Sequence, residues 1–567
     1  MANQTGTSFL TLPVELIHGI LDHQTDYTIL CSMRNTLTTL DLRSNKIGHV
    51  GAQHLGYILQ HNTTLTTLYL GWNEIGDVGA ERLARGLRHN TALTTLGLES
   101  NQIEHVGAQY LSDALRHNTI LTSLELGYNR IGHVGTQHFT DALRYNTTLT
   151  SLSLESNKIG DVGVQHLIDA LQHNTAIVIL SSSIPYIYHH FLISSLTTLS
   201  FESNQIGDVG AQPLAAALRH NKILTTLGLG WNEIGDVGAQ QLANALRHNT
   251  ALTTLGLRCN KIGHVGAQYL GDALRHNKTL TILGLGYNQI GDVGTQNLAT
   301  ALRYNTALAT LGLESCLIGD LGAQHIADSL RQNTSLTTLS FESNEIGDVG
   351  AQHLADALRH NPTLTTLGLG SNQIRQTGAQ HLSDALRHNK TLTTLGLGYN
   401  EIGDVGVQQF ADALQHNTTL TILSLESNKI GDVGAQYVAD ALQHNTVLTV
   451  LDLRSNQIGD VGVQQLANAL RYNIGLTVLD LHGNRIGVFA AQHLADGVRH
   501  NTTLTTLGLT YNKIENVGVQ HLADRLRQNT TLAIRNRWRN QVGGDVMQEI
   551  KEFVNRIKEE EDWPLLY

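Results

Sequence analysis

The chain has few cysteines and no recognisable secretion signal. Its 567 residues include only three cysteines, Cys31, Cys259 and Cys316, which cannot supply the disulfide-bonded caps of a secreted protein. The first sixteen residues, MANQTGTSFLTLPVEL, lack both a basic region and an apolar region. We therefore expect a reduced protein of the cytoplasm or nucleus.

Charged residues are sparse and mainly negative. Lys and Arg number 37 against 48 Asp and Glu, which gives a formal net charge of -11. No basic run is present, so nucleic acid is not an expected partner. The most apolar irregular stretch, residues 177–195, is interrupted by serines and by Pro185, which argues against a membrane span.

Motifs of catalytic, metal and nucleotide sites are also missing. HExxH, Cys-x-x-Cys, GxxxxGK[ST] and GxSxG do not occur. The 29 histidines invite a metal interpretation, but many recur at one position of a repeat. On neighbouring helices such side chains would lie about 8–10 Å apart, whereas a shared zinc ion needs both nitrogens at about 2.0–2.1 Å. We predict no catalytic residue, no metal and no cofactor.

The chain consists mostly of a 28-residue repeat. The sequence LTTLGLGWNEIGDVGAQQLANALRHNTA, residues 224–251, returns with small changes in 17 full copies between residues 37 and 531. Leucines alternate with polar residues in its first part, which predicts a strand with one buried face. The second part has the apolar spacing of a helix.

The repeat at residues 65–92 illustrates the expected local structure. Asp77 is a candidate N-cap of the helix, and Val78, Leu83 and Leu87 fall on one expected buried face. Asn90 would end the helix, because asparagine tolerates the left-handed conformation.

A second asparagine, the head asparagine, follows each strand. It is Asn73 in the same repeat and is present in every full copy but one. Its side chain can bond the backbone of adjacent turns and form a ladder along the array. Cys316 replaces it in residues 308–335, where we expect a weak point of the fold and not a reactive thiol.

One strand and one helix per repeat predict a parallel sheet covered by parallel helices. Because strands lie about 4.8 Å apart and helices about 8–10 Å apart, the sheet should be concave. The pattern LxxLxLxxN followed by IGDVGAQxLAxALRxN resembles the ribonuclease-inhibitor subclass of leucine-rich repeats, which also occurs in NOD-like immune sensors and Ran GTPase-activating proteins. This resemblance implies an α/β solenoid, a horseshoe or superhelical coil, with helices on the convex face.

Residues 10–36 are unlike any repeat. The segment LTLPVELIHGIL resembles the start of an F-box, which docks on the Skp-type adaptor of a cullin ubiquitin ligase. The resemblance implies adaptor contacts by Leu12, Pro13, Leu16, Ile20, Leu21, Ile29 and Leu30. The last F-box helix is missing or replaced by the first repeat, so the alternative is that this segment only caps the array.

The repeats are interrupted once. Five repeats span residues 37–176 and twelve span 196–531, while 532–567 form a partial repeat and a C-terminal cap. Removing residues 177–195 restores the period. This insertion is a degenerate repeat with a strand at Ile177–Leu180, a surface loop or a translated intron.

Two kinds of side chain recur on the expected concave face. An aromatic residue directly precedes the head asparagine at Trp72, Tyr128, Trp231, Tyr287, Tyr399 and Tyr511. Glutamate lies two residues before it at Glu99, Glu155, Glu202, Glu314, Glu342 and Glu426. A basic or mixed protein partner would suit this face, although duplication of repeats alone could have produced the pattern.

The sequence thus predicts a non-enzymatic protein-recognition scaffold. The leading hypothesis is a substrate receptor of an SCF-type ubiquitin ligase, with a protein target on the concave face and a Skp-type adaptor at the N-terminus. The alternatives are a GTPase-activating protein of the Ran-directed type and a freestanding sensor array of the NOD-like type.

Overall fold

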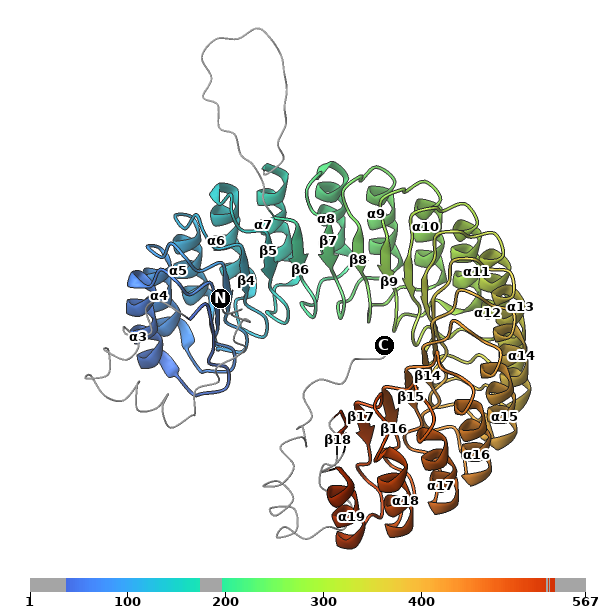
Figure 1. Cartoon of the computed structure of the whole chain (residues 1–567). Helices are drawn as coiled ribbons and strands as arrows, with labels where there is room; N and C mark the ends of the chain where they lie inside the picture. The colour runs from blue at the N-terminus through green and yellow to red at the C-terminus, as the bar shows by residue number, and fades with distance from the viewer. Residues whose placement is uncertain (1–36, 174–195, 527–528, 530, 536–567) are drawn as a thin grey trace, which may run out of the picture. The chain divides into compact units, whose positions relative to one another are not determined.

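The structure is a computed structural model that describes residues 37–173, 196–526, 529 and 531–535. It divides into an N-terminal part, which ends at Gly284, and a C-terminal part, which begins at Leu285. In each part the strands form a concave layer and the helices cover its outer side (Figure 1). Each part is therefore an α/β leucine-rich repeat solenoid, as predicted.

The N-terminal part alternates short strands with helices of 11–14 residues. Its described strands are β1 (Thr39–Asp41), β2 (Thr67–Tyr69), β3 (Thr95–Gly97), β4 (Ser123–Glu125), β5 (Ser151–Ser153), β6 (Thr198–Ser200), β7 (Thr226–Gly228), β8 (Thr254–Gly256) and β9 (Ile282–Gly284). Its described helices are α3 (Gly48–His61), α4 (Gly76–Leu87), α5 (His105–Leu115), α6 (Gly132–Tyr145), α7 (Gly160–His173), α8 (Asp208–His220), α9 (Asp236–Leu246) and α10 (His264–Leu274).

The C-terminal part has the same alternation. Its described strands are β10 (Thr310–Gly312), β11 (Thr338–Ser340), β12 (Thr366–Gly368), β13 (Thr394–Gly396), β14 (Ile422–Ser424), β15 (Val450–Asp452), β16 (Val478–Asp480), β17 (Thr506–Gly508) and β18 (Ala533–Arg535). Its described helices are α11 (Gly291–Leu302), α12 (Asp320–Leu330), α13 (Asp348–Leu358), α14 (Gln376–Leu386), α15 (Gly403–Leu414), α16 (Asp432–Leu442), α17 (Asp460–Leu470), α18 (Val488–Val498) and α19 (Asn516–Leu526).

Neighbouring strands within each part are parallel and keep one register. Leu68 pairs with Leu96 between β2 and β3, and Leu367 pairs with Leu395 between β12 and β13. The same leucine position therefore forms a continuous buried row in each part, because the strand pattern has a period of two residues. Leu68, Leu83 and their equivalents are fully buried between the sheet and the helices.

The insertion does not disturb this register. β5 pairs directly with β6, and the backbone N–H of Asn157 donates to Asn204 Oδ1 at 3.0 Å across 47 residues. Among the described residues, β5 and β6 are therefore neighbouring strands of the sheet. The predictions for residues 177–195 fall outside the described residues.

Val78 corrects the predicted buried face of the helix. Leu83 and Leu87 are buried, but the Val78 side chain is 53% exposed. Valines at the same position of other repeats are exposed as well. The helical spacing allowed Val78 on the apolar stripe, but the buried face of α4 begins at Gly79 and Ala80.

The head asparagines form the predicted ladder. Asn101 Oδ1 accepts the backbone N–H groups of Asn73 at 3.0 Å and Ile75 at 3.4 Å, and its Nδ2 donates to the carbonyls of Leu70 and Glu99. One buried amide thus satisfies backbone groups of two repeats, which would otherwise be buried without partners.

The closing asparagine does not adopt the predicted left-handed conformation. Asn62, Asn146 and Asn221 are extended, with φ between -82° and -69°. Instead the side chain links two repeats: Asn90 Nδ2 donates to the carbonyls of Leu59 and Asn62. The closing asparagines therefore form a second ladder of side-chain amides, and they do not end the helix by adopting a left-handed conformation.

We predicted that the aspartate at the start of each helix caps that helix, but it caps the helix of the next repeat. Asp77 lies in the first turn of α4 and forms no capping bond there. Its Oδ1 accepts the N–H groups of Glu104 at 2.7 Å and Gly107 at 2.9 Å, at the start of α5 in the next repeat. Each such aspartate therefore places its charge at the positive end of a neighbouring helix.

This aspartate sets the backbone conformation of the next repeat. The backbone N–H of Gly207 donates to Asp161 Oδ1, and Gly207 is extended, with φ of -99°. Gly76 follows a repeat that has His49 in place of the aspartate; its φ is +61°, and its N–H donates to the carbonyl of Asn101. Where a repeat lacks this aspartate, the next repeat thus has its glycine in the left-handed region.

We expect Gly76→Ala to destabilise its repeat by about 1–2 kcal/mol, because alanine is disfavoured in the left-handed region. A steric clash does not contribute to this loss of stability, since a Cβ added to Gly76 would meet no atom within 4 Å. Gly207→Ala is the matched control, where the nearest atom would be 3.7 Å away and φ is ordinary; it should be neutral or slightly stabilising. Local hydrogen exchange measures both, and equal effects would contradict the assignment.

Cys316 occupies the head-asparagine position in the C-terminal part. It is buried, and its Sγ donates to the carbonyl of Leu285 at 3.2 Å. Burial raises the pKa of the thiol to about 12, which keeps it protonated and so disfavours reaction as a thiolate. The thiol has no oxygen that could accept the backbone N–H of Ile290. In other repeats the equivalent N–H donates to the head asparagine.

Candidate binding surface

Three positions of each repeat form what we call the strand face. They are the residue before the last strand leucine, the residue after that leucine, and the residue before the head asparagine. In the repeat at 93–120 these are Gly97, Glu99 and Ser100. They lie on the concave layer of each part (Figure 1).

The six predicted aromatic side chains are exposed on the strand face. Trp231, for example, is 57% exposed. All six lie in the left-handed region, with φ between 54° and 58°, where a bulky residue is unfavourable. Serine takes this position in many other repeats, and Gly483 in one. Neither burial nor backbone preference therefore explains the aromatic residues. They are Trp72, Tyr128, Trp231, Tyr287, Tyr399 and Tyr511.

The six predicted glutamates are half-buried, because glycines of adjacent repeats make room for them. A Cβ added to Gly368 would overlap with Oε1 of Glu342, and one added to Gly228 would lie 3.1 Å from Oε1 of Glu202. The alternation of glycine-rich aromatic repeats with acidic repeats is thus sterically complementary. The glutamates are Glu99, Glu155, Glu202, Glu314, Glu342 and Glu426.

Some aromatic and acidic side chains of successive repeats contact each other. The Tyr128 hydroxyl donates to Glu155 Oε1 at 2.7 Å, and the Tyr399 hydroxyl donates to Glu426 Oε1 at 3.0 Å. The structure therefore brings together residues that the sequence presents as separate rows. Each pair has an exposed ring beside a half-buried carboxylate.

Burial and mutual repulsion raise the pKa of several glutamates. Burial, with a hydrogen bond that protonated Glu99 donates to Glu125, raises the pKa of Glu99 to about 7. Burial alone is the main cause that raises the pKa of Glu342 to about 7, and neither of its carboxylate oxygens has a hydrogen-bond partner among the described residues. Both side chains favour a proton or an external cation near neutral pH.

We expect Glu342→Gln to stabilise its repeat at pH 8 by about 1–3 kcal/mol and to have no effect at pH 4. The folded chain binds the Glu342 proton more tightly than the unfolded chain, since its pKa is raised from 4.5 to about 7. Stability is therefore full below pH 4.5 and falls as the pH rises toward 7. Thermal melting across this range measures the effect. Glu345→Gln, at an exposed glutamate, is the control, and equal shifts at both pH values would contradict the prediction.

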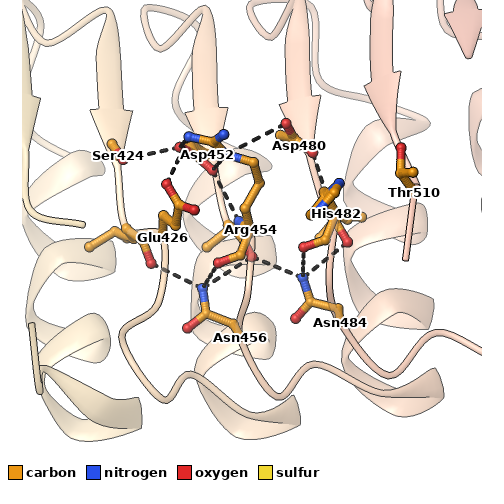
Figure 2. Close-up of polar contacts among 12 residues, drawn as sticks. Ser424, Glu426, Asp452, Arg454, Asn456, Asp480, His482, Asn484 and Thr510 are labelled. Atoms are coloured by element: carbon orange, nitrogen blue, oxygen red, sulfur yellow. Dashed lines mark hydrogen bonds and ion pairs between the residues drawn. The ribbon is translucent and has the colours of Figure 1, made fainter. Parts of the chain in front are cut away.

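A polar cluster on β14, β15 and β16 was not predicted from the sequence (Figure 2). Arg454 donates to both carboxylate oxygens of Asp452, at 2.9 and 2.8 Å, and to Glu426 Oε2 at 2.8 Å. Its Nε also lies 3.7 Å from Asp480 Oδ2. Asp452 and Asp480 are buried. One guanidinium thus faces three carboxylates.

This cluster has an excess of negative charge. Burial raises the pKa of Asp480 to about 6, and the surrounding carboxylates raise the pKa of Arg454. The available sequence signal was the change from LGLGYN to LDLRSN and LDLHGN in two adjacent repeats. It could not be interpreted without the register that places Asp452, Arg454 and Asp480 side by side.

Acidic side chains outnumber basic ones on the strand face of both parts. In the N-terminal part the charged positions are Asp41, Arg43, Glu99, Glu125, Glu155, Glu202 and Arg258. In the C-terminal part they are Glu314, Glu342, Glu426, Asp452, Arg454 and Asp480. The strand face of each part therefore has more negative than positive charges.

A family model described as Leucine Rich repeat matches more than half of the chain. The matched residues are 35–56, 61–84, 89–112, 117–136, 145–167, 193–215, 220–243, 248–271, 276–299, 332–355, 360–383, 388–411, 416–439, 444–467 and 500–523. The chain belongs to the leucine-rich repeat family. Repeats of this kind build extended protein-binding surfaces and are typically not enzymes.

Two solved structures illustrate the similarity of this leucine-rich repeat protein to known chains. An internalin (inlF) from Listeria monocytogenes is 23% identical; the match covers 61% of this chain and 88% of the internalin, with a TM-score of 0.38. The leiomodin-1 actin-binding site 2 is 24% identical, with 23% of this chain and 76% of that one covered and a TM-score of 0.22. No curated protein is significantly similar in sequence.

Within the described residues, no group of three or more His, Cys, Asp or Glu side chains is arranged to bind a metal ion. None of the helices in that same portion of the chain combines the length and apolarity needed to cross a membrane. The predicted adaptor residues Leu12, Pro13, Leu16, Ile20, Leu21, Ile29 and Leu30 lie outside the described residues.

Proposed function

We propose that this leucine-rich repeat protein is a non-enzymatic recognition scaffold whose strand face binds the basic side chains of a protein partner. The observation that carries the proposal is the row of exposed aromatic rings in an unfavourable backbone conformation beside half-buried glutamates. Outliers of this kind gather at binding sites, where contacts with a ligand justify the strain.

The chemistry of the two rows favours Lys and Arg side chains. Half-buried carboxylates such as Glu342 are poorly solvated and gain from an external cation. Exposed Trp and Tyr rings attract the same cations through their faces and are enriched at binding hot spots. A partner segment that carries basic residues would meet both kinds of group at once.

The test measures the affinity of a fluorescein-labelled octalysine peptide for the full chain. We expect Tyr399→Ser to weaken binding about fivefold or more. Serine already occupies this position in other repeats, so the variant should fold. Tyr472→Ser is the matched control, because Tyr472 is 73% exposed but lies just after α17, outside the strand face. Equal loss in both variants, or no binding to the intact chain, would refute the proposal.

We further propose that residues 10–36 tether the scaffold to a Skp-type adaptor, so that the protein is the substrate receptor of an SCF-type ubiquitin ligase. Support comes from the F-box-like sequence alone. Such a tether would raise the concentration of a bound target near the ligase. Co-purification of the adaptor with the intact chain, and its loss in a Leu16→Asp, Ile20→Asp double variant, tests the tether. A folded intact chain that binds no adaptor would reduce this segment to a cap.

We also propose that the repeats belong to the ribonuclease-inhibitor-like subclass, in the predicted order of repeats at 37–176 and 196–531. Helices of 11–14 residues in 28-residue repeats support this assignment. A helix in every repeat widens the outer layer and so favours the concave strand face on which binding depends.

A further inference from the structure

We infer that the C-terminal part binds an acidic side chain of the same partner in a hollow at the edge of the strand face, so that the partner's charges are ordered across Tyr399. The inference rests on the proposed function and adds the chemistry of a second contact. The hollow has a volume of about 450 Å³. It is lined by Asn372, Gln373, Arg375, Tyr399, Asn400, Glu401, Ser427 and Lys429.

Two cations flank one carboxylate in this hollow. Lys429 Nζ donates to Glu401 Oε1 at 2.6 Å, and Arg375 Nε donates to Glu401 Oε2 at 3.3 Å. Arg375 and Lys429 remain 66% and 60% exposed, so most of their donor groups face solvent. Elsewhere the same edge has a balanced pair, Lys261 with Glu233. The hollow therefore has one positive charge in excess.

A local departure from the repeat creates this excess. Residues 375–377 are Arg-Gln-Thr, where most repeats have Gly-Asp-Val or Gly-His-Val. The fold tolerates arginine at position 375 because Asp348 accepts its backbone N–H at 2.8 Å, which keeps the backbone extended. Arg375 also forms a backbone bridge with Glu401. The bridge holds both side chains at the same edge of the hollow.

The opposite charge lies at the hydroxyl of Tyr399. Its ring lines the hollow, and its hydroxyl donates to Glu426 Oε1. Glu426 belongs to the cluster around Arg454, in which three carboxylates face one guanidinium (Figure 2). A partner segment that crosses Tyr399 would therefore present basic groups toward the strand face and an acidic group toward the hollow.

Three labelled peptides test this order of charges by fluorescence anisotropy with the full chain. KKKGGSSS measures the basic contact alone, KKKGGEEE adds the acidic block, and KEKGGEKE has the same composition as KKKGGEEE without the blocks. We expect KKKGGEEE to bind at least tenfold more tightly than either of the others. The double variant Arg375→Gly, Lys429→Gln should abolish this advantage and should not weaken the binding of KKKGGSSS.

Both substitutions introduce residues that other repeats have at these positions, Gly347 and Gln457 for example, so the variant should fold. Lys261→Gln is the matched control and should keep the advantage of KKKGGEEE. If KKKGGSSS binds but KKKGGEEE gains nothing, or if the double variant keeps the gain, this inference is wrong and the proposed function stands. If KKKGGSSS does not bind the intact chain, the proposed function fails as well.

Discussion

Replacing Arg454 by alanine is expected to destabilise the repeats around β15 by about 3–5 kcal/mol at neutral pH. The substitution removes the guanidinium that Asp452, Glu426 and Asp480 share. Asp452 and Asp480 are buried, so their charges cannot regain solvent without local opening. A buried charge that loses its partner costs far more than the intact pair contributes.

Hydrogen exchange of peptides that cover β15 and β16 measures this loss. Repeats contact only their neighbours, so the change should remain local. The penalty should shrink as the pH falls below about 6, since burial raises the pKa of Asp480 to about 6 and protonation removes its charge. Arg485→Ala is the control, because Arg485 is an exposed residue bonded to Gln457. Equal effects of the two substitutions would show that the cluster has no role in stability.

Replacing Asn101 by alanine is expected to destabilise its repeat by about 3 kcal/mol or more. The substitution leaves the buried N–H groups of Asn73 and Ile75 without their acceptor and removes donors from two carbonyls. Each buried donor left without a partner costs about 1–3 kcal/mol. No rearrangement within one repeat can replace these bonds, because Asn101 lies between two repeats.

Cys316 provides the reciprocal experiment. Cys316→Asn should stabilise its repeat by about 1–2 kcal/mol, because an amide oxygen replaces a thiol sulfur, which is a weak acceptor. Asn101→Cys should have the opposite sign. Asn297→Ala, which removes one exposed bond to Val293, is the control for loss of an amide and should have little effect. Thermal melting measures all three, and a destabilising Cys316→Asn would refute the account of the ladder.

The sequence was sufficient for the fold because the leucine pattern is local and repeated. Leucines such as Leu68 and Leu70 identify the buried face of a strand without knowledge of its neighbours. The head-asparagine ladder could also be predicted from the repeat, because an asparagine at the same position of every repeat meets the same backbone groups of its neighbours. Exposure of aromatic residues such as Trp231 could be predicted from the glycines beside them.

The polar details were decided only in the tertiary structure. Asp77 caps the next helix, Asn90 bonds across repeats and Glu342 is half-buried over Gly368, all through contacts between residues 26–31 positions apart. The cluster around Arg454 has the same origin. A sequence pattern describes each repeat by itself, whereas these interactions depend on the register between repeats. That register determines which carboxylates share a cation, because electrostatic interactions depend on distance and burial and not on sequence spacing.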